Sequence, residues 1–235
     1  AISPGFPIPN SAFDIRWNDY AIGLLEQTQY GEAAAAFRKA AELNPADTML
    51  LVNAAIAEMG TERFGPELEQ FAKAELLLAA ALQHDPANER ALYYRALVWR
   101  AQGQGREAAA TLRQLAARWP RDREIQRQLG QTLFALGALP EARNAMEAVL
   151  RVDPTDFLSW QFLSSLYLGE NRQADADMAG KLYLQWRDDP VADTIAAKFY
   201  STHPEWADER IRAHTHGVNS AARPVLTGVQ AGPDK

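Results

Sequence analysis

Apolar residues, large and small, alternate with polar ones along this chain in a pattern that predicts pairs of amphipathic helices. The first pair carries its apolar positions at Trp17, Tyr20, Ala21 and Leu24, and then at Ala33, Phe37 and Ala40. Asn44-Pro45 follows the second run. Proline lacks an amide hydrogen and its ring clashes with the preceding turn, so it ends a helix at a defined residue. The segment therefore predicts two helices that end at Pro45.

The same arrangement returns at a regular interval along the chain. Prolines end successive segments at positions 45, 86, 120, 154 and 190, and the three middle ones are 34 residues apart. The matching apolar and small positions of the later units include Leu92, Ala96, Trp99, Ala108, Leu112, Leu129, Gly130, Leu133, Ala142, Met146, Trp160, Leu163, Ser164 and Tyr167. The intervals of 41 and 36 residues in the second and fifth units predict an inter-helix loop at 60–66 and a last helix about half a turn longer.

A helix-turn-helix unit of this length, with large and small residues at these positions, resembles the tetratricopeptide repeat family. The resemblance covers residues 14–190 and implies an all-α fold: a right-handed superhelical solenoid of about five units with a C-terminal capping helix and irregular ends. The expected units are residues 14–47, 48–88, 89–122, 123–156 and 157–190. Asp47, Asn88 and Asp156 stand where they can cap the helices that follow.

In this family the first helix of each unit lines a protein-binding groove. The resemblance places these residues in the groove: Asn18, Ile22, Asn53, Tyr93, Tyr94, Arg100, Arg127, Gln128, Gln131, Phe134, Gln161 and Phe162. Tyrosine and arginine dominate interface energetics, and they concentrate here with phenylalanine in the third to fifth units. The alternative is that Tyr93 and Phe162 pack between neighbouring helices instead of facing a partner.

The two ends of the chain lack the repeat pattern. Residues 1–13 contain three prolines and predict an extended arm, which is either a disordered leader or an assembly arm anchored on a neighbouring subunit by Phe6 and Ile8. Residues 191–202 predict a helix that caps the last unit. Residues 203–235 combine glycine, proline and serine without a period and predict an irregular tail.

Charge and hydropathy exclude two classes of partner. The net charge of −6 argues against a nucleic-acid binder, which normally carries a basic excess. No stretch approaches the roughly 18 apolar residues of a membrane helix, so no membrane span is expected. Residues 89–154 nevertheless carry eleven arginines, no lysine and seven acidic residues. This stretch is either a solvated helix face or an arginine-lined surface for an acidic partner.

Sequence motifs of catalysis are missing, which predicts a non-catalytic chain. There is no Gly-x-Ser-x-Gly, no phosphate-binding glycine loop, no His-Glu-x-x-His and no cysteine nucleophile. His203, His214 and His216 are candidate metal ligands, and the alternatives are solvated imidazoles or an imidazole offered to a partner's metal or haem. The absence of cysteine excludes disulfides and covalent c-type haem on this chain, so no cofactor is expected on it.

Three short segments suggest a partner. Residues 16–25, 119–123 and 181–184, the last followed by His203-Pro204-Glu205, look similar to the repeat regions that accompany bacterial multihaem c-type cytochromes. The resemblance implies an exported accessory subunit, periplasmic or extracellular, that docks on or sheathes such a cytochrome, which carries the haem. A first residue other than Met and the lack of cysteine fit export. The alternative is a structural protein that polymerises through the solenoid ends and terminal arms.

Overall fold

The computed structural model describes residues 13–60 and 68–189, and these ranges contain ten α-helices and no strand. The helices pair as α1 (Phe13–Glu26) with α2 (Tyr30–Leu43), α3 (Thr48–Gly60) with α4 (Leu68–His84), α5 (Glu89–Ala101) with α6 (Gly105–Arg118), α7 (Arg123–Ala135) with α8 (Leu139–Val152), and α9 (Phe157–Gly169) with α10 (Gln173–Arg187). The all-α repeat solenoid expected from the sequence is confirmed.

Three details of the expected boundaries can be compared with these helices. Phe13, which was assigned to the N-terminal arm, is the first residue of α1, because the last proline of the arm lies at position 9 and leaves residue 13 free to be helical. The last helix, α10, has 15 residues where α6 and α8 have 14, so it is longer by one residue. Most of the loop expected at 60–66 lies outside the described residues.

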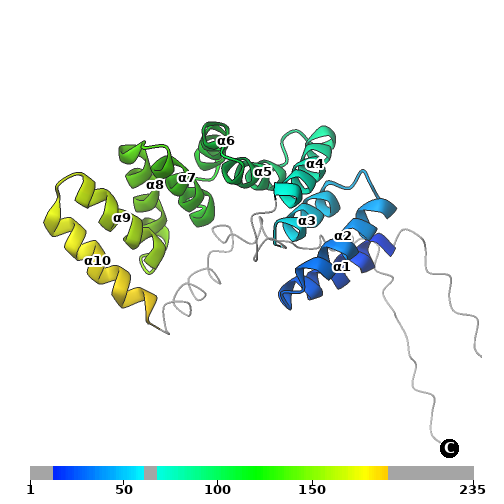
Figure 1. The fold of residues 1–235 in the computed structure, drawn as a ribbon, viewed down its shortest axis with the longest axis horizontal. Helices are drawn as coiled ribbons and strands as arrows, with labels where there is room; N and C mark the ends of the chain where they lie inside the picture. The colour runs from blue at the N-terminus through cyan, green and yellow to red at the C-terminus, as the bar shows by residue number, and fades with distance from the viewer. Residues whose placement is uncertain (1–12, 61–67, 190–235) are drawn as a thin grey trace, which may run out of the picture.

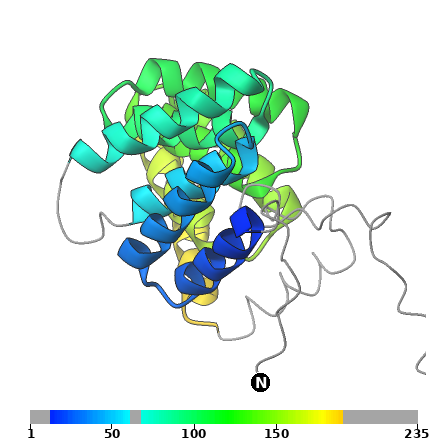
Figure 2. The same cartoon turned by 90° about the vertical axis from the view of Figure 1, so that its right-hand side faces the viewer.

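The ten helices follow one another along a single arc from α1 to α10 (Figure 1). Each helix packs on the helices before and after it, and odd-numbered helices also contact their counterparts in the next unit, as in α1–α3, α3–α5 and α5–α7. Helices on the inner side of a curved stack approach their counterparts more closely than helices on the outer side. The odd-numbered helices therefore line the concave side, and Figure 2 shows the same stack with α1 and α2 in front.

Each turn between units uses the same chemistry. Four side chains cap the following helices: Asp47, Asn88, Asp122 and Asp156. At the last of these turns, the Asp156 N–H donates to the Asp153 carbonyl over 3.2 Å, and the Asp156 carboxylate accepts from the Ser159 N–H over 2.8 Å. The caps predicted at Asp47, Asn88 and Asp156 are confirmed, and Asp122 adds a fourth. Each cap satisfies a backbone N–H in the first turn of the helix that follows.

In the first, third, fourth and fifth units, where the structure describes it, the turn between the two helices closes with a left-handed residue. The equivalent residues and their φ angles are Thr28 (60°), Gly103 (82°), Gly137 (75°) and Asn171 (58°). At Gly137 the next N–H, from Ala138, donates to the Leu133 carbonyl over 2.9 Å, and the Gly137 N–H donates to Phe134 over 3.0 Å. This pair of bonds is the Schellman motif, which satisfies the last carbonyls of the first helix.

The core is built from equivalent positions of successive units and divides into three buried clusters. The large, fully buried residues Phe37, Leu78, Leu112 and Met146 occupy equivalent positions in α2, α4, α6 and α8. A Cβ added to Gly130 would lie 2.8 Å from Cε of Met146, so the small residue lets α7 and α8 approach closely. The buried clusters join the second helix of one unit to the first helix of the next, as where Ala54 packs with Phe37.

Candidate binding surface

The twelve residues expected in the groove differ in their exposure. Asn18 and Asn53 are buried, which corrects the expectation that they face a partner, and Tyr93 is buried between neighbouring helices, as its alternative had it. Gln161 is exposed, and the half-buried residues are Ile22, Tyr94, Arg100, Arg127, Gln128, Gln131, Phe134 and Phe162. The three buried side chains lie where the first helix of the next unit covers them. They support the surface from beneath and do not form it.

In the first three units, buried amides connect the odd-numbered helices. The Asn53 side-chain N–H donates to the Asn18 side-chain oxygen over 2.8 Å. Arg90 then donates from Nη2 to the Asn53 side-chain oxygen over 2.5 Å. Burial lowers the pKa of Arg90 to about 10, which leaves the guanidinium charged at neutral pH. One polar chain therefore links α1, α3 and α5.

A second polar cluster centres on Glu124 in α7. Its Oε1 accepts from the Tyr93 hydroxyl over 3.2 Å and from Nε2 of Gln128 over 2.6 Å. Arg127 contacts the other Glu124 oxygen and also donates to Oδ2 of Asp156 over 2.6 Å. We call these four side chains and Asp156 the central cluster, which joins units three, four and five.

The central cluster holds Glu124 in its ionised form. Burial alone would raise the pKa of this carboxyl, but the Arg127 charge and the hydrogen bonds from Gln128, Arg127 and Tyr93 bring it below its usual range. The pKa of the Tyr93 phenol lies well above its usual value, because the ring is buried and faces the Glu124 carboxylate. Both shifts favour one protonation state at neutral pH, with the tyrosine as donor and the glutamate as acceptor.

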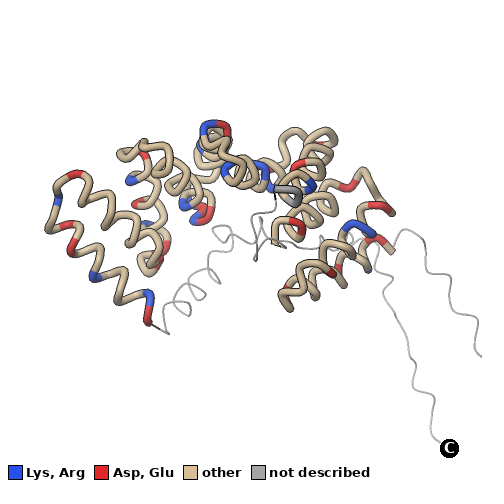
Figure 3. Tube along the Cα trace, in the orientation of Figure 1, with Lys and Arg blue, Asp and Glu red and all other residues tan. Residues whose placement is uncertain are grey.

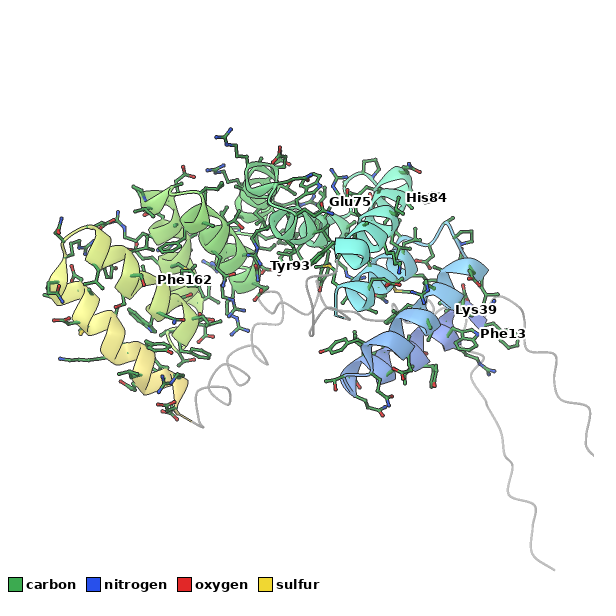
Figure 4. The ribbon with its side chains drawn as sticks, viewed as in Figure 1. Phe13, Lys39, Glu75, His84, Tyr93 and Phe162 are labelled. Carbon is green, nitrogen blue, oxygen red and sulfur yellow. The ribbon has the colours of Figure 1, made fainter. Side chains whose placement is uncertain are left out.

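Half-buried side chains cover the central cluster on its concave side. Nη1 of Arg100 donates to the Oε1 atoms of Gln128 over 2.5 Å and Gln131 over 3.2 Å. The rings of Phe134 and Phe162 meet edge to face, with their centroids 5.4 Å apart. We call Tyr94, Arg100, Gln131, Phe134 and Phe162 the inner row. Figure 4 labels Phe162 on α9 and Tyr93, the neighbour of Tyr94, on α5, toward opposite ends of this row.

The arginines of residues 89–154 mostly have partners within the chain. Their ion pairs include Arg113–Glu141 (2.8 Å), Arg118–Glu89 (2.8 Å), Arg123–Asp153 (2.6 Å) and Arg143–Glu170 (2.7 Å). Figure 3 shows basic and acidic positions interleaved along the helices. Arg106 and Arg151 are exposed and have no ion-pair partner among the described residues. Most of these guanidinium groups therefore bind residues of neighbouring helices, so neither alternative, the solvated helix face or the arginine-lined surface, describes the whole stretch.

Several expected sites lie outside the described residues. These are the arm residues Phe6 and Ile8, the capping helix at 191–202, the tail at 203–235, and the candidate metal ligands His203, His214 and His216. Within the described ranges, no group of three or more histidine or acidic residues is arranged to hold a metal ion. No described helix combines the length and the apolar character that crossing a membrane requires.

Sequence reasoning missed Glu124, although it organises the central cluster. Its signal was the spacing Glu124-x-x-Arg127, which places an acid and a base on one helical face. Arg90 was also missed, because its partner Asn53 belongs to the preceding unit and no local pattern pairs the two.

Comparison with known proteins agrees with this architecture. Residues 99–166 match the tetratricopeptide repeat family, so the resemblance seen in the sequence is confirmed. The crystal structure of MamA protein is similar with a TM-score of 0.60 and 16% identity, covering 76% of this chain and 93% of that one. MamA 41-end from Desulfovibrio magneticus RS-1 gives a TM-score of 0.63 and 18% identity, covering 74% and 94%.

A third solved structure is similar in the same way. YrrB, described as a TPR protein with an unusual peptide-binding site, has a TM-score of 0.58 and 21% identity, covering 80% of this chain and 94% of its own. No curated protein matches the sequence. At these identities, the three structures show a shared fold.

Proposed function

We propose that this chain is a non-catalytic protein-binding scaffold that holds a segment of a partner protein against the inner row. The observation that carries the proposal is the chemistry of that row. Two aromatic rings packed edge to face, a tyrosine, a guanidinium group and an amide are all partly exposed on the concave side. Tyrosine and arginine are the residues on which interface energy usually concentrates. The peptide-binding site named for YrrB, which has the same fold, supports this use.

Contacts of the inner-row side chains with one another and with Gln128 order the row before a partner binds. Arg100 is held by two glutamine side chains, and Phe134 by Phe162, before any partner arrives. Side chains that are already ordered lose less conformational entropy on binding, so more of the contact energy appears as affinity. The matching partner segment places an apolar side chain on the phenylalanine pair and a carbonyl or carboxylate oxygen near Arg100.

For the partner, we propose a multihaem c-type cytochrome in the periplasm or outside the cell. The support is the similarity of residues 16–25, 119–123 and 181–184 to cytochrome-associated repeat regions, together with the absence of cysteine, which leaves any c-type haem to the partner. Arg106 and Arg151 have exposed guanidinium groups that can meet acidic side chains or haem propionates.

Isolation of the native complex tests both parts of the proposal. A Soret band in the visible spectrum, with a haem protein identified by mass spectrometry, supports the cytochrome as partner. A colourless complex would refute the cytochrome as the partner. The scaffold function would then be tested by the affinity of the variants for whatever protein co-purifies. We expect Phe162→Ala and Arg100→Ala each to weaken binding of the co-purified partner at least about tenfold. Arg113→Ala, which removes an exposed ion pair between α6 and α8, is the matched control and leaves binding unchanged. Equal affinity for all variants would refute the inner row as the site.

A further inference from the structure

The first unit exposes a face that the later units bury. Tyr20 in α1 is 57% exposed, whereas Ala54, Leu129 and Leu163 at the same repeat position are buried and Arg95, in the third unit, is half-buried. The position is buried in those units because the second helix of the preceding unit packs on it, as Ala54 packs with Phe37 of α2. Trp17 lies beside Tyr20, with its ring edge to face at 6.0 Å, and is 38% exposed. The start of the described array is therefore an open aromatic face.

In the earlier units, the second helix packs on the first helix of the next unit. The last unit exposes the corresponding face of its second helix, α10. Leu184 in α10 is 52% exposed, whereas at its repeat position Ala41, Leu82 and Ala116 are buried and Leu150 is half-buried. Those four residues belong to α2, α4, α6 and α8, each of which is followed by another unit. The end of the described array thus presents an apolar residue where the next first helix would pack.

The charges at the two ends match a pair that already exists inside the array. Arg113, the ninth residue of α6, binds Glu141, the third residue of α8, with its Nε and Nη2 2.9 and 2.8 Å from one carboxylate oxygen. Lys181 is the ninth residue of α10, and Glu32 is the third residue of α2. Both are exposed, and neither has an ion-pair partner among the described residues. A second copy stacked on α10 as α7 and α8 stack on α6 would bring Glu32 to Lys181.

We propose that the chain associates head to tail with a second copy, with α10 of one copy packed on α1 of the next, Leu184 against Trp17 and Tyr20, and Lys181 paired with Glu32. The contact repeats the geometry between consecutive units. It joins two different faces, so it leaves a free face at each end and can propagate into chains longer than dimers. Self-assembly through the solenoid ends is the alternative function that the sequence raised. The proposed contact specifies the interface for such assembly. It uses the ends of the array and leaves the inner row open, so it stands independently of the proposed binding function.

Complementation between two blocked variants tests the head-to-tail arrangement. Sedimentation velocity of the full chain over a concentration series should show dimers and longer species. Tyr20→Asp blocks one face and Leu184→Asp the other, so each variant alone should remain monomeric. An equimolar mixture still contains one intact face of each kind and should form dimers and nothing longer. A mixture that stays monomeric while the unmodified chain assembles would overturn the proposal. An unmodified chain that is monomeric at every concentration would also overturn the proposal. That result is expected if residues 191–202 of the same chain cover α10.

A charge exchange tests the proposed register. Lys181→Glu and Glu32→Lys should each weaken association about tenfold, because each places like charges in contact, and the double variant should restore it. Leu76→Asp is the matched control, since Leu76 is an exposed leucine on α4, away from both ends, and its substitution should leave association unchanged. Phe162→Ala should also leave it unchanged. Circular dichroism verifies that each variant is folded. Failure of the double variant to regain association would refute this register.

Discussion

Thr28 occupies the left-handed turn position that glycine fills in two later units, with φ of 60°. A β-branched residue in this region of backbone space is strained, at a cost of about 1–2 kcal/mol, and part of that cost returns as lower chain entropy in the unfolded state. We expect Thr28→Gly to raise the free energy of unfolding by about 1 kcal/mol, measured by urea denaturation. The reverse exchange at the equivalent turn, Gly137→Thr, should lower it by a similar amount. An unchanged midpoint for Thr28→Gly would contradict the strain.

Glu124 should contribute to the free energy of unfolding by an amount that depends on pH. Its folded-state pKa lies below the ordinary value of 4.5, so the folded protein holds this proton less tightly than the unfolded chain. The stabilisation is therefore complete above the ordinary pKa and is lost as the pH falls through the folded-state pKa. We expect Glu124→Gln to lower the free energy of unfolding by about 2 kcal/mol at pH 7, because it removes the charge opposite Arg127.

The difference between the Glu124→Gln variant and the unmodified chain should shrink as the pH is lowered below about 4.5. Denaturant titrations at a series of pH values measure it. Glu107→Gln, at an exposed position of α6, is the matched control and should change stability little at any pH. If the difference in free energy of unfolding stayed constant into the acid range, the packing of Glu124 and not its negative charge would account for it.

The helix that opens the fifth unit shows how one residue can serve two elements. Asp156 caps α9 through the Ser159 N–H and also pairs with Arg127 of α7. Asp156→Asn keeps the cap and removes the charge, whereas Asp156→Ala removes both. We expect losses of about 1 and about 2–3 kcal/mol respectively, measured by thermal or urea unfolding. Asn88→Ala, which removes a cap alone, should cost about 1 kcal/mol. Equal losses for the two variants would mean that the cap contributes nothing, and an unchanged stability of Asp156→Asn would mean that the Arg127 ion pair contributes nothing.

The helices themselves followed from the sequence, because the signals that start and end them are local. Proline and a capping side chain mark each turn between units, and both stand within a few residues of the helix they control. The orientation of individual side chains could not be predicted from the sequence. Tyr93 and Tyr94 are neighbours, yet Tyr93 is buried and Tyr94 half-buried, because the stacking of α7 on α5 covers one face and leaves the other.

The arginines show the same limit. The sequence shows how many there are, but their partners depend on the rotation between neighbouring units. Arg113 and Glu141 are 28 residues apart and meet only because α6 and α8 lie together. The repeat register was enough to predict which residues belong to the inner row. It was not enough to predict how far each side chain is buried or which residue it binds.

At the scale of the whole molecule, the buried clusters are unevenly distributed. One cluster extends through the third to fifth units, and the central cluster and the Phe134–Phe162 pair lie in the same region. The first two units rest on two smaller clusters, of which the one formed by α1, α2 and α3 consists mostly of alanines, such as Ala33, Ala54 and Ala57. Because alanine removes little apolar surface from water, these units gain less from burial than the later ones. We infer that stability increases from the N-terminal units toward the third to fifth.

Hydrogen exchange measures that gradient directly. In a solenoid each unit contacts only its neighbours, so local unfolding can differ from one end to the other. We expect amide protection to be higher in α5–α9 than in α1–α4. Leu112→Ala and Phe37→Ala each empty a fully buried position at a cost of about 2–5 kcal/mol. Leu112→Ala should lower protection mainly in α5–α8, and Phe37→Ala mainly in α1–α3, because each cavity weakens the units that share it. A uniform loss of protection across all helices in both variants would show that the array unfolds as one cooperative unit instead.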